Sequence, residues 1–104
     1  MRRIGLKPEY LPLVAAGRKR STIRAGAKPD LVGPALLVAG PESLSVEIAS
    51  VDVKRLAELD QIDAERDGFD SLAELRAALA RFYPTLSEDD AVSILHFAAV
   101  PAAA

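Results

Sequence analysis

The sequence has 104 residues and half of them are hydrophobic, so it can build one domain around one core but has no room for a second. The absence of cysteine excludes disulfides and thiolate metal sites, and a single histidine excludes a cluster of histidine ligands, so we expect no cofactor. The net charge is −2 and no apolar run approaches the roughly 20 residues that cross a bilayer, so we expect a cytoplasmic protein with no membrane partner.

The first quarter of the chain is predicted to form a strand, a helix and a second extended segment. Residues 2–7 read as a short strand because their apolar side chains alternate with polar ones. Pro8 suits the first turn of a helix, and apolar residues follow it at helical spacing up to Gly17, a residue that commonly ends helices. Residues 18–25 are then expected to be extended.

The middle of the chain is predicted to be mostly strand. Residues 27–34 contain two prolines and a glycine and should form a loop. Residues 35–39 are expected to form a buried strand. Residues 43–53 alternate in polarity, but the alternation changes phase near Ala49 and Ser50, which predicts a β-bulge in this strand.

Residues 56–67 are expected to form short helical turns, and a longer helix follows. Ser71 and Glu74 have the spacing of a capping box, in which each side chain accepts a hydrogen bond from the main chain of the other. Pro84 ends this helix, and residues 91–100 read as a final strand. The predicted buried stripe of the helix consists of Leu72, Leu75, Leu79 and Phe82.

This order of elements predicts an α+β fold: a closed or nearly closed small β-barrel with helices on its flank. The first helix follows the first strand too closely for a doubly wound parallel sheet. All 104 residues are expected to belong to one domain, with residues 101–104 as a frayed tail.

Charge is distributed unevenly along the chain. Residues 1–28 carry a net charge of +7, and residues 29–104 carry −9. Such an asymmetry indicates an anionic partner such as RNA. The alternative is that the two parts neutralise each other on the folded surface.

The positive charge is concentrated in residues 17–24, which hold four cations and two hydroxyl groups. In an extended strand, Arg20, Thr22 and Arg24 point to one side and their neighbours to the other. Guanidinium groups at this spacing suit phosphate or carboxylate oxygens. Lys19 lies at the turn, so it could join Thr22 in the same pocket. The alternative is a solvated basic edge strand that discourages aggregation.

These segments resemble a known family. Residues 6–10 and 14–24 resemble the opening signature of ASCH domains, which belong to the PUA-like barrels, and the likeness continues through residues 63–69, 82–84 and 92–97. Its most specific parts are the patterns G-x-K-x-x-T-x-R and D-A-x-x-[DE]-G-F. The resemblance, which is to small bacterial stand-alone members, implies a PUA-like barrel of five to six strands with helices beside a cleft.

ASCH domains are widely proposed to bind RNA, so the resemblance implies RNA or a nucleoside as the partner of a basic cleft. In that case Lys7, Arg18, Arg20 and Arg24 would contact phosphate groups, and affinity would fall with salt. Tyr10 or Tyr83 would stack on a base held in the cleft.

Some small bacterial members are instead amidohydrolases that remove an acyl group from N4-acylated cytidine. They use a lysine, a threonine three residues later and a downstream carboxylate, which Lys19, Thr22 and Asp67 match, with Asp67 in place of a glutamate. The lysine would take the proton of the threonine, which attacks the acyl carbon, and the carboxyl would protonate the leaving amine. Other members are reported as ribonucleases, for which Asp63, Glu65 or Asp67 would hold a divalent ion. The resemblance does not choose among these functions.

Overall fold

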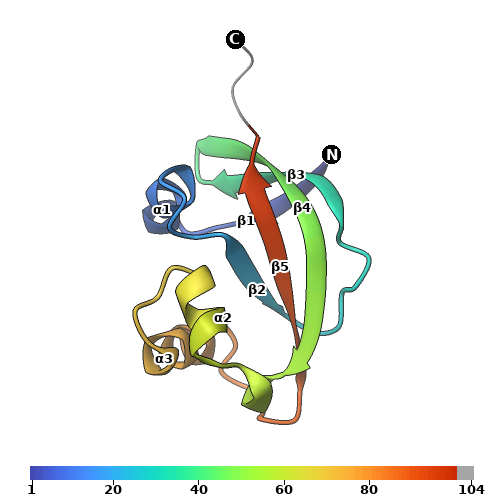
Figure 1. Ribbon diagram of the computed structural model, residues 1–104, viewed down its shortest axis with the longest axis vertical. Helices are drawn as coiled ribbons and strands as arrows, with labels where there is room; N and C mark the ends of the chain where they lie inside the picture. The colour runs from blue at the N-terminus through green and yellow to red at the C-terminus, as the bar shows by residue number, and fades with distance from the viewer. Residues whose placement is uncertain (101–104) are drawn as a thin grey trace.

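A single five-stranded sheet curls around one side of the molecule, and the helices lie beside it (Figure 1). The computed structural model describes residues 1–100; the predicted frayed tail, residues 101–104, lies outside the described residues. The strands, in chain order, are β1 (Arg2–Gly5), β2 (Ser21–Ala25), β3 (Gly33–Ala39), β4 (Glu42–Arg55) and β5 (Ala91–Ala99).

The strand order is β1-β3-β4-β5-β2, so β1 and β2 are the two edges of the sheet. Strand β1 pairs with β3 in parallel, and every other neighbouring pair is antiparallel. The predicted α+β fold, a small β-barrel of five to six strands with flanking helices, is therefore confirmed with five strands. The sheet is a curled half-barrel that stays open between β1 and β2.

The predicted irregularity in the long strand is also present. Strand β4 pairs with β3 through its first half and with β5 along most of its length. Its register against β5 shifts between Ile48 and Ser50, where the alternation of the sequence changes phase. Because a bulge increases the local twist of a strand, this position lets β4 follow the curl of the sheet.

Short helices connect the strands. They are the 3₁₀ turn η1 (Pro8–Tyr10), α1 (Leu11–Ala15), the 3₁₀ turn η2 (Leu56–Glu58), α2 (Gln61–Arg66) and α3 (Leu72–Phe82). As predicted, Gly17 follows the end of the first helix, with a φ of +77° that glycine adopts without strain. Within residues 1–100, no helix combines the length and the apolar character that crossing a membrane requires.

Helix α3 differs from the prediction at two points. The hydroxyl of Ser71 accepts a hydrogen bond from the main-chain N–H of Glu74, as expected, but the Glu74 carboxylate accepts from the N–H of Asp70 rather than of Ser71. The capping box is therefore only half formed. Phe82, expected in the buried stripe, is 40% exposed because its ring borders a cavity instead of the core.

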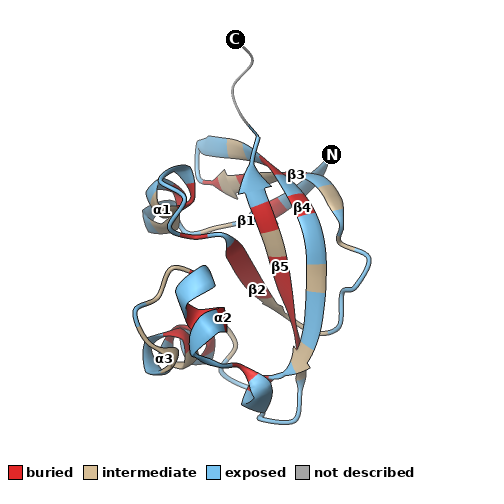
Figure 2. Cartoon of the chain, in the orientation of Figure 1, coloured by how far each residue is buried: buried red, intermediate tan, exposed pale blue. Residues whose placement is uncertain are grey.

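Strand β5 separates two hydrophobic clusters. Leu95 and Phe97 belong to the cluster inside the half-barrel, which α1 covers, and Val92 and Ile94 belong to the cluster beneath α2 and α3. Successive side chains of a strand point to opposite faces, so β5 is buried on both. Figure 2 shows this buried part of β5 beside the buried part of β2. The edge strand β2 is thus held rigidly by a central strand.

Candidate functional site

A cavity of about 540 Å³ opens beside the edge strand β2. Its walls come from the turn between β1 and η1, from β2, from the segment after α2, and from α3. Most of the lining is apolar or aromatic and a few polar groups converge in it, which is typical of a site for a small organic ligand. The polar lining consists of Lys7, Lys19, Thr22, Arg24 and Asp67, together with Tyr10 and Tyr83.

The basic segment, residues 17–24, and residues 63–69 are far apart in the sequence but meet in this cavity. The Nζ of Lys19 lies 3.1 Å from Oδ1 of Asp67 and donates to the main-chain oxygen of the same residue at 3.0 Å. The hydroxyl of Ser21 donates to Oδ1 of Asp67 at 3.2 Å. The side chains of Lys19 and Asp67 are only 3% and 7% exposed, so they form a buried ion pair.

Main-chain contacts hold the two segments together. The N–H of Arg20 donates to the main-chain oxygen of Arg66 at 2.7 Å. Gly68, just after α2, has a φ of +94°, which side chains disfavour, and a Cβ at this position would lie 3.3 Å from the Cβ of Lys19. Glycine therefore serves both the turn that ends α2 and the close approach of Asp67 to Lys19.

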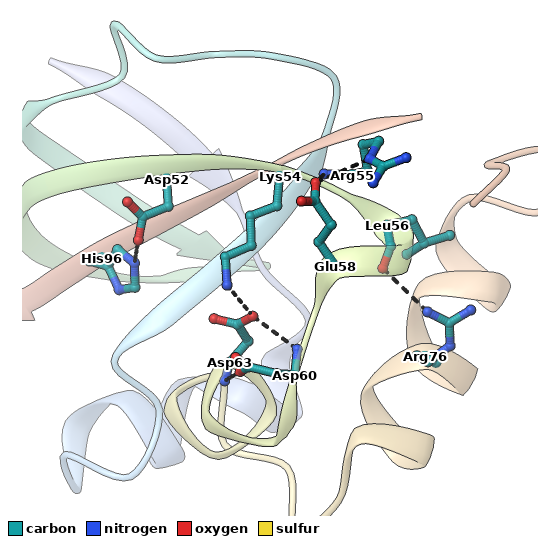
Figure 3. Close-up of polar contacts among 9 residues, drawn as sticks. All are labelled: Asp52, Lys54, Arg55, Leu56, Glu58, Asp60, Asp63, Arg76 and His96. Atoms are coloured by element: carbon teal, nitrogen blue, oxygen red, sulfur yellow. Dashed lines mark hydrogen bonds and ion pairs between the residues drawn. The ribbon is translucent and has the colours of Figure 1, made fainter. Parts of the chain in front are cut away.

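The beginning of α2 is anchored to strand β4 (Figure 3). The Nζ of Lys54 donates to Oδ2 of Asp63 at 2.8 Å, and the same oxygen accepts from the main-chain N–H of Asp60 at 3.0 Å. In return, Oδ1 of Asp60 accepts from the N–H of Asp63 at 2.9 Å, which completes a capping box. Because Asp67 directly follows this six-residue helix, anchoring its start also fixes the position of the Asp67 carboxylate.

Burial shifts the pKa values of the ion pair toward each other. Burial lowers the pKa of Lys19, and the charge and hydrogen bond of Asp67 oppose this shift. Burial raises the pKa of Asp67, against the opposing effects of Lys19, the Ser21 hydroxyl and Arg24. Both shifts favour the uncharged forms, an amine and a carboxylic acid. Paired shifts of this kind are common where acid–base chemistry takes place.

The hydroxyl of Thr22 is held by Arg24. Nη1 of Arg24 donates to Oγ1 of Thr22 at 2.8 Å and to the main-chain oxygen of Ile23 at 3.1 Å, while Nη2 donates to the main-chain oxygen of Gly5. The guanidinium thus crosses the open edge of the half-barrel from β2 to β1. Because Oγ1 of Thr22 accepts the bond from Arg24, its own hydrogen remains available for donation.

The expected alternation along the basic segment does not decide which side chains reach the cavity. Thr22, Ile23 and Arg24 are consecutive and all line it. The reason is that β2 is an edge strand, so side chains from both of its faces border the space beside its unpaired side. Lys19, which precedes the strand, also lines the cavity, as the sequence suggested.

Two of the predicted binding residues lie outside the cavity lining. Arg18 forms an ion pair with Asp70, and both side chains are exposed. Arg20 is exposed and makes no ion pair within residues 1–100. The remaining predicted site residues border the same cavity: Lys7, Lys19, Thr22, Arg24, Asp67 and Tyr83.

Aromatic rings complete the cavity. The ring of Tyr10 lies 5.3 Å from the Nζ of Lys19 and packs edge to face against Phe69, with ring centroids 6.2 Å apart. At the mouth, the Nζ of Lys7 lies 4.9 Å from the ring centroid of Phe82. These cation–π contacts orient both lysine side chains. Lys7 makes no ion pair with a carboxylate among residues 1–100.

The acidic residues of α2 do not gather into a metal site. Asp63 and Asp67 each pair with a different lysine, and Glu65 is exposed. In the part of the chain that the structure describes, no group of three or more histidines and carboxylates is placed to hold a metal ion. His96, whose Nε2 lies 2.8 Å from Oδ2 of Asp52, lies outside the cavity lining (Figure 3).

Sequence reasoning assigned no role to Ser21 or Gly68. Gly68 directly follows a predicted helical segment, and a glycine in this place is a common helix terminator, so its conformation could have been predicted. The bond from Ser21 to Asp67 joins residues 46 positions apart, and no local pattern indicates it.

Comparison with known proteins gives a fold but no sequence family. No family model matches the sequence, and no curated protein matches it significantly. An ASCH domain from Lactobacillus crispatus JV V101 superimposes with a TM-score of 0.75 at 21% identity, covering 94% of this chain and 79% of that one. The hypothetical protein PH0355 gives a TM-score of 0.71 at 21% identity, covering 96% of this chain and 100% of its own.

The protein EF3133 from Enterococcus faecalis V583, of the DUF984 family, is also similar, with a TM-score of 0.64 at 19% identity, covering 86% of this chain and 68% of that one. Agreement over most of the chain at such low identity establishes the architecture. The chain therefore has the fold of a small ASCH domain, as the motifs of its sequence implied.

Proposed function

We propose that the cavity binds a nucleoside and that Lys19, Thr22 and Asp67 hydrolyse an amide bond on it, as in removal of the acyl group from N4-acylated cytidine. The observation that carries this proposal is the buried Lys19–Asp67 pair in the same cavity as the Thr22 hydroxyl. The substrate class comes from the ASCH resemblance. A volume of about 540 Å³ with apolar and aromatic walls suits a planar base.

Lys19 acts as the general base in this proposal. A lysine accepts a proton only as a neutral amine, and burial lowers the pKa of Lys19 toward that form. In the first step, Lys19 takes the hydroxyl proton of Thr22 and becomes an ammonium ion. The Thr22 oxygen attacks the acyl carbon and forms a tetrahedral intermediate with a negatively charged oxygen.

Arg24 supports this step in two ways. Its bond to Oγ1 of Thr22 fixes the nucleophile and, because the donor is cationic, stabilises negative charge on that oxygen. Nε and one hydrogen of Nη2 have no acceptor among the described residues, so they remain available for the oxyanion.

Asp67 acts as the general acid. Burial raises its pKa and favours the protonated carboxyl, which donates its proton to the leaving nitrogen as the carbon–nitrogen bond breaks. The amine departs and the acyl group remains as an ester on Thr22. Water then attacks this ester and gives one proton to the Asp67 carboxylate. The carboxylic acid is released as the Lys19 ammonium returns its proton to the Thr22 oxygen.

An aspartate stands where the hydrolases carry a glutamate, and it is shorter by one methylene, roughly 1.5 Å of reach. The close approach at Gly68 offsets this difference. It brings the main-chain oxygen of Asp67 itself to 3.0 Å from the Nζ of Lys19, so the shorter carboxyl still contacts the lysine. In this proposal the shorter side chain of Asp67 is therefore sufficient to pair with Lys19.

The test is release of acetate from N4-acetylcytidine by the purified protein. We expect turnover by the native chain, and a loss of about a hundredfold or more on Thr22→Ala because the nucleophile is removed. Thr85→Ala, at an exposed position, is the matched control and should keep full activity. Circular dichroism checks that both variants fold. No turnover by the native protein contradicts the proposal.

RNA binding without hydrolysis is the second candidate. It is favoured by Lys7, Arg20 and Arg24, none of which pairs with a carboxylate in the described part of the chain. The test is the salt dependence of affinity for a short RNA. We expect a steep fall with salt and a smaller slope for Lys7→Gln. Affinity that does not change with salt rejects this function.

A further inference from the structure

A second cavity, of about 590 Å³, lies on the other side of Arg24. It is bordered by β1, by the loop after β2 and by Leu95 of β5. Its lining contains four cations, Arg2, Arg3, Arg24 and Lys28, and one acidic residue, Asp30. Apart from Arg24, none of its lining residues belongs to the patterns G-x-K-x-x-T-x-R and D-A-x-x-[DE]-G-F.

The two cavities share one wall. Arg24 and Gly5 line both of them. The hydrogen bond from Nη2 of Arg24 to the main-chain oxygen of Gly5 spans the gap between the two edge strands, so this bond divides the open side of the half-barrel into two compartments. A ligand lying across Arg24 would reach both.

The cations of the second cavity are not neutralised by the protein. Within residues 1–100, none of the four forms an ion pair with a carboxylate. The contact between Arg2 and Asp30 is a hydrogen bond from Nη1 to the main-chain oxygen, at 2.8 Å, and it leaves the charge of Arg2 uncompensated. Unneutralised cations that surround a concave site attract an anion.

The loop that carries Lys28 is held in place. The hydroxyl of Ser93, which is fully buried, accepts from the main-chain N–H of Lys28 at 2.8 Å and donates to the main-chain oxygen of Gly26 at 2.7 Å. The N–H of Gly26 also pairs with the main-chain oxygen of Ala91. The cavity wall is therefore preformed, which lowers the entropy cost of binding.

We propose that this second cavity binds a phosphate group, and that the phosphate belongs to the ligand held in the first cavity, which makes that ligand a mononucleotide rather than a free nucleoside. Arginine is well suited to phosphate because its planar guanidinium donates two parallel hydrogen bonds. The nucleoside part of this inference rests on the proposed function; the phosphate site rests on the second cavity alone.

The experiment measures the affinity of the protein for cytidine and for cytidine 5′-monophosphate by calorimetry. The test variant is Arg3→Gln with Lys28→Gln. The control variant, Arg66→Gln with Arg81→Gln, loses the same charge from exposed residues that line neither cavity. We expect the monophosphate to bind about tenfold more tightly than cytidine, and this advantage to disappear in the test variant and persist in the control.

Equal binding of the two ligands, or an equal loss in the control variant, overturns the inference. A dinucleoside phosphate could instead bind more tightly than the monophosphate, with the same dependence on Arg3 and Lys28. That result would assign the site to an RNA backbone and overturn the inference that the ligand is a mononucleotide.

A titration with inorganic phosphate separates this inference from the proposed function. If the protein binds neither cytidine nor its monophosphate, the nucleoside proposal fails, but amide shifts in residues 2–5 and 26–31 that vanish in the test variant would still support the phosphate site. The absence of such shifts overturns it.

Discussion

Two lysine–aspartate pairs flank the short helix α2, and they behave in opposite ways. Lys54 and Asp63 lie 2.8 Å apart at the start of the helix, and Lys19 and Asp67 lie 3.1 Å apart at its end. The hydrogen bond to Asp63 raises the pKa of Lys54, whereas burial lowers the pKa of Lys19. The side chain of Lys54 is 29% exposed and that of Lys19 is 3% exposed.

The difference shows that the partner does not decide the chemistry of a lysine. Both lysines face a nearly buried carboxylate, but only Lys54 keeps contact with water. Water solvates the ammonium of Lys54, so the carboxylate adds to its stability. Lys19 has lost this solvation, and the carboxylate only partly replaces it. The pair at the start of α2 is therefore an anchor, and the pair at its end is the one that we propose takes part in catalysis.

Removing each lysine should give the largest contrast between the pairs. Lys19→Met leaves the Asp67 carboxylate buried without its counter-charge, and we expect the free energy of unfolding to fall by about 3 kcal/mol. Lys54→Met leaves Asp63 with its bond from the N–H of Asp60, and we expect a loss of about 1 kcal/mol. Urea unfolding at neutral pH measures both. Similar losses in the two variants would mean that burial does not distinguish the pairs.

The pH dependence of the Lys19→Met variant sharpens this contrast. Without Lys19, the pKa of Asp67 should rise further, because the interactions that oppose the effect of burial are lost. A carboxyl whose pKa is higher in the folded state stabilises the fold at low pH, and this stability is lost as the pH rises through the folded-state value. We expect the variant to lose more stability than the native chain when the pH is raised from about 5 to about 8.

Unfolding curves at the two pH values check this expectation. The double variant Lys19→Met, Asp67→Leu is the control, because it removes the buried carboxyl and should lose the added pH dependence. A Lys19→Met variant whose stability changes with pH as the native chain does would show that Asp67 is not the titrating group.

The sequence predicted features that depend on a local pattern of residues. It did not predict features that depend on which strand lies at the edge of the sheet. The bulge at Ile48 and Ser50 was predictable because it shifts the alternation of polarity within one strand. The meeting of Lys19 with Asp67 came from the resemblance, since no spacing rule joins residues so far apart. Alternation could not assign Ile23 to the cavity, because the unpaired side of β2 is a property of strand order.

The close approach at Gly68 is what allows Lys19 and Asp67 to pair. In Gly68→Ala, the new Cβ would meet the Cβ of Lys19 at 3.3 Å in a backbone conformation of positive φ, and we expect a loss of roughly 1–2 kcal/mol. Gly40→Ala has positive φ without a close neighbour and serves as the control for backbone strain alone. Activity on N4-acetylcytidine should fall only for Gly68→Ala, because only that change displaces Lys19 from Asp67.

Ser21→Ala should have a small effect on stability, about 1 kcal/mol, since it removes one hydroxyl bond to Asp67. The variant also tests the role of Asp67 as the general acid, through the pH profile of kcat/KM. The Ser21 hydroxyl lowers the pKa of Asp67, so its loss raises that pKa. If Asp67 must be protonated to release the amine, activity declines as the pH rises through this value, and the alkaline limb should move to higher pH. A limb that stays in place, or moves to lower pH, would assign the acid step to another group.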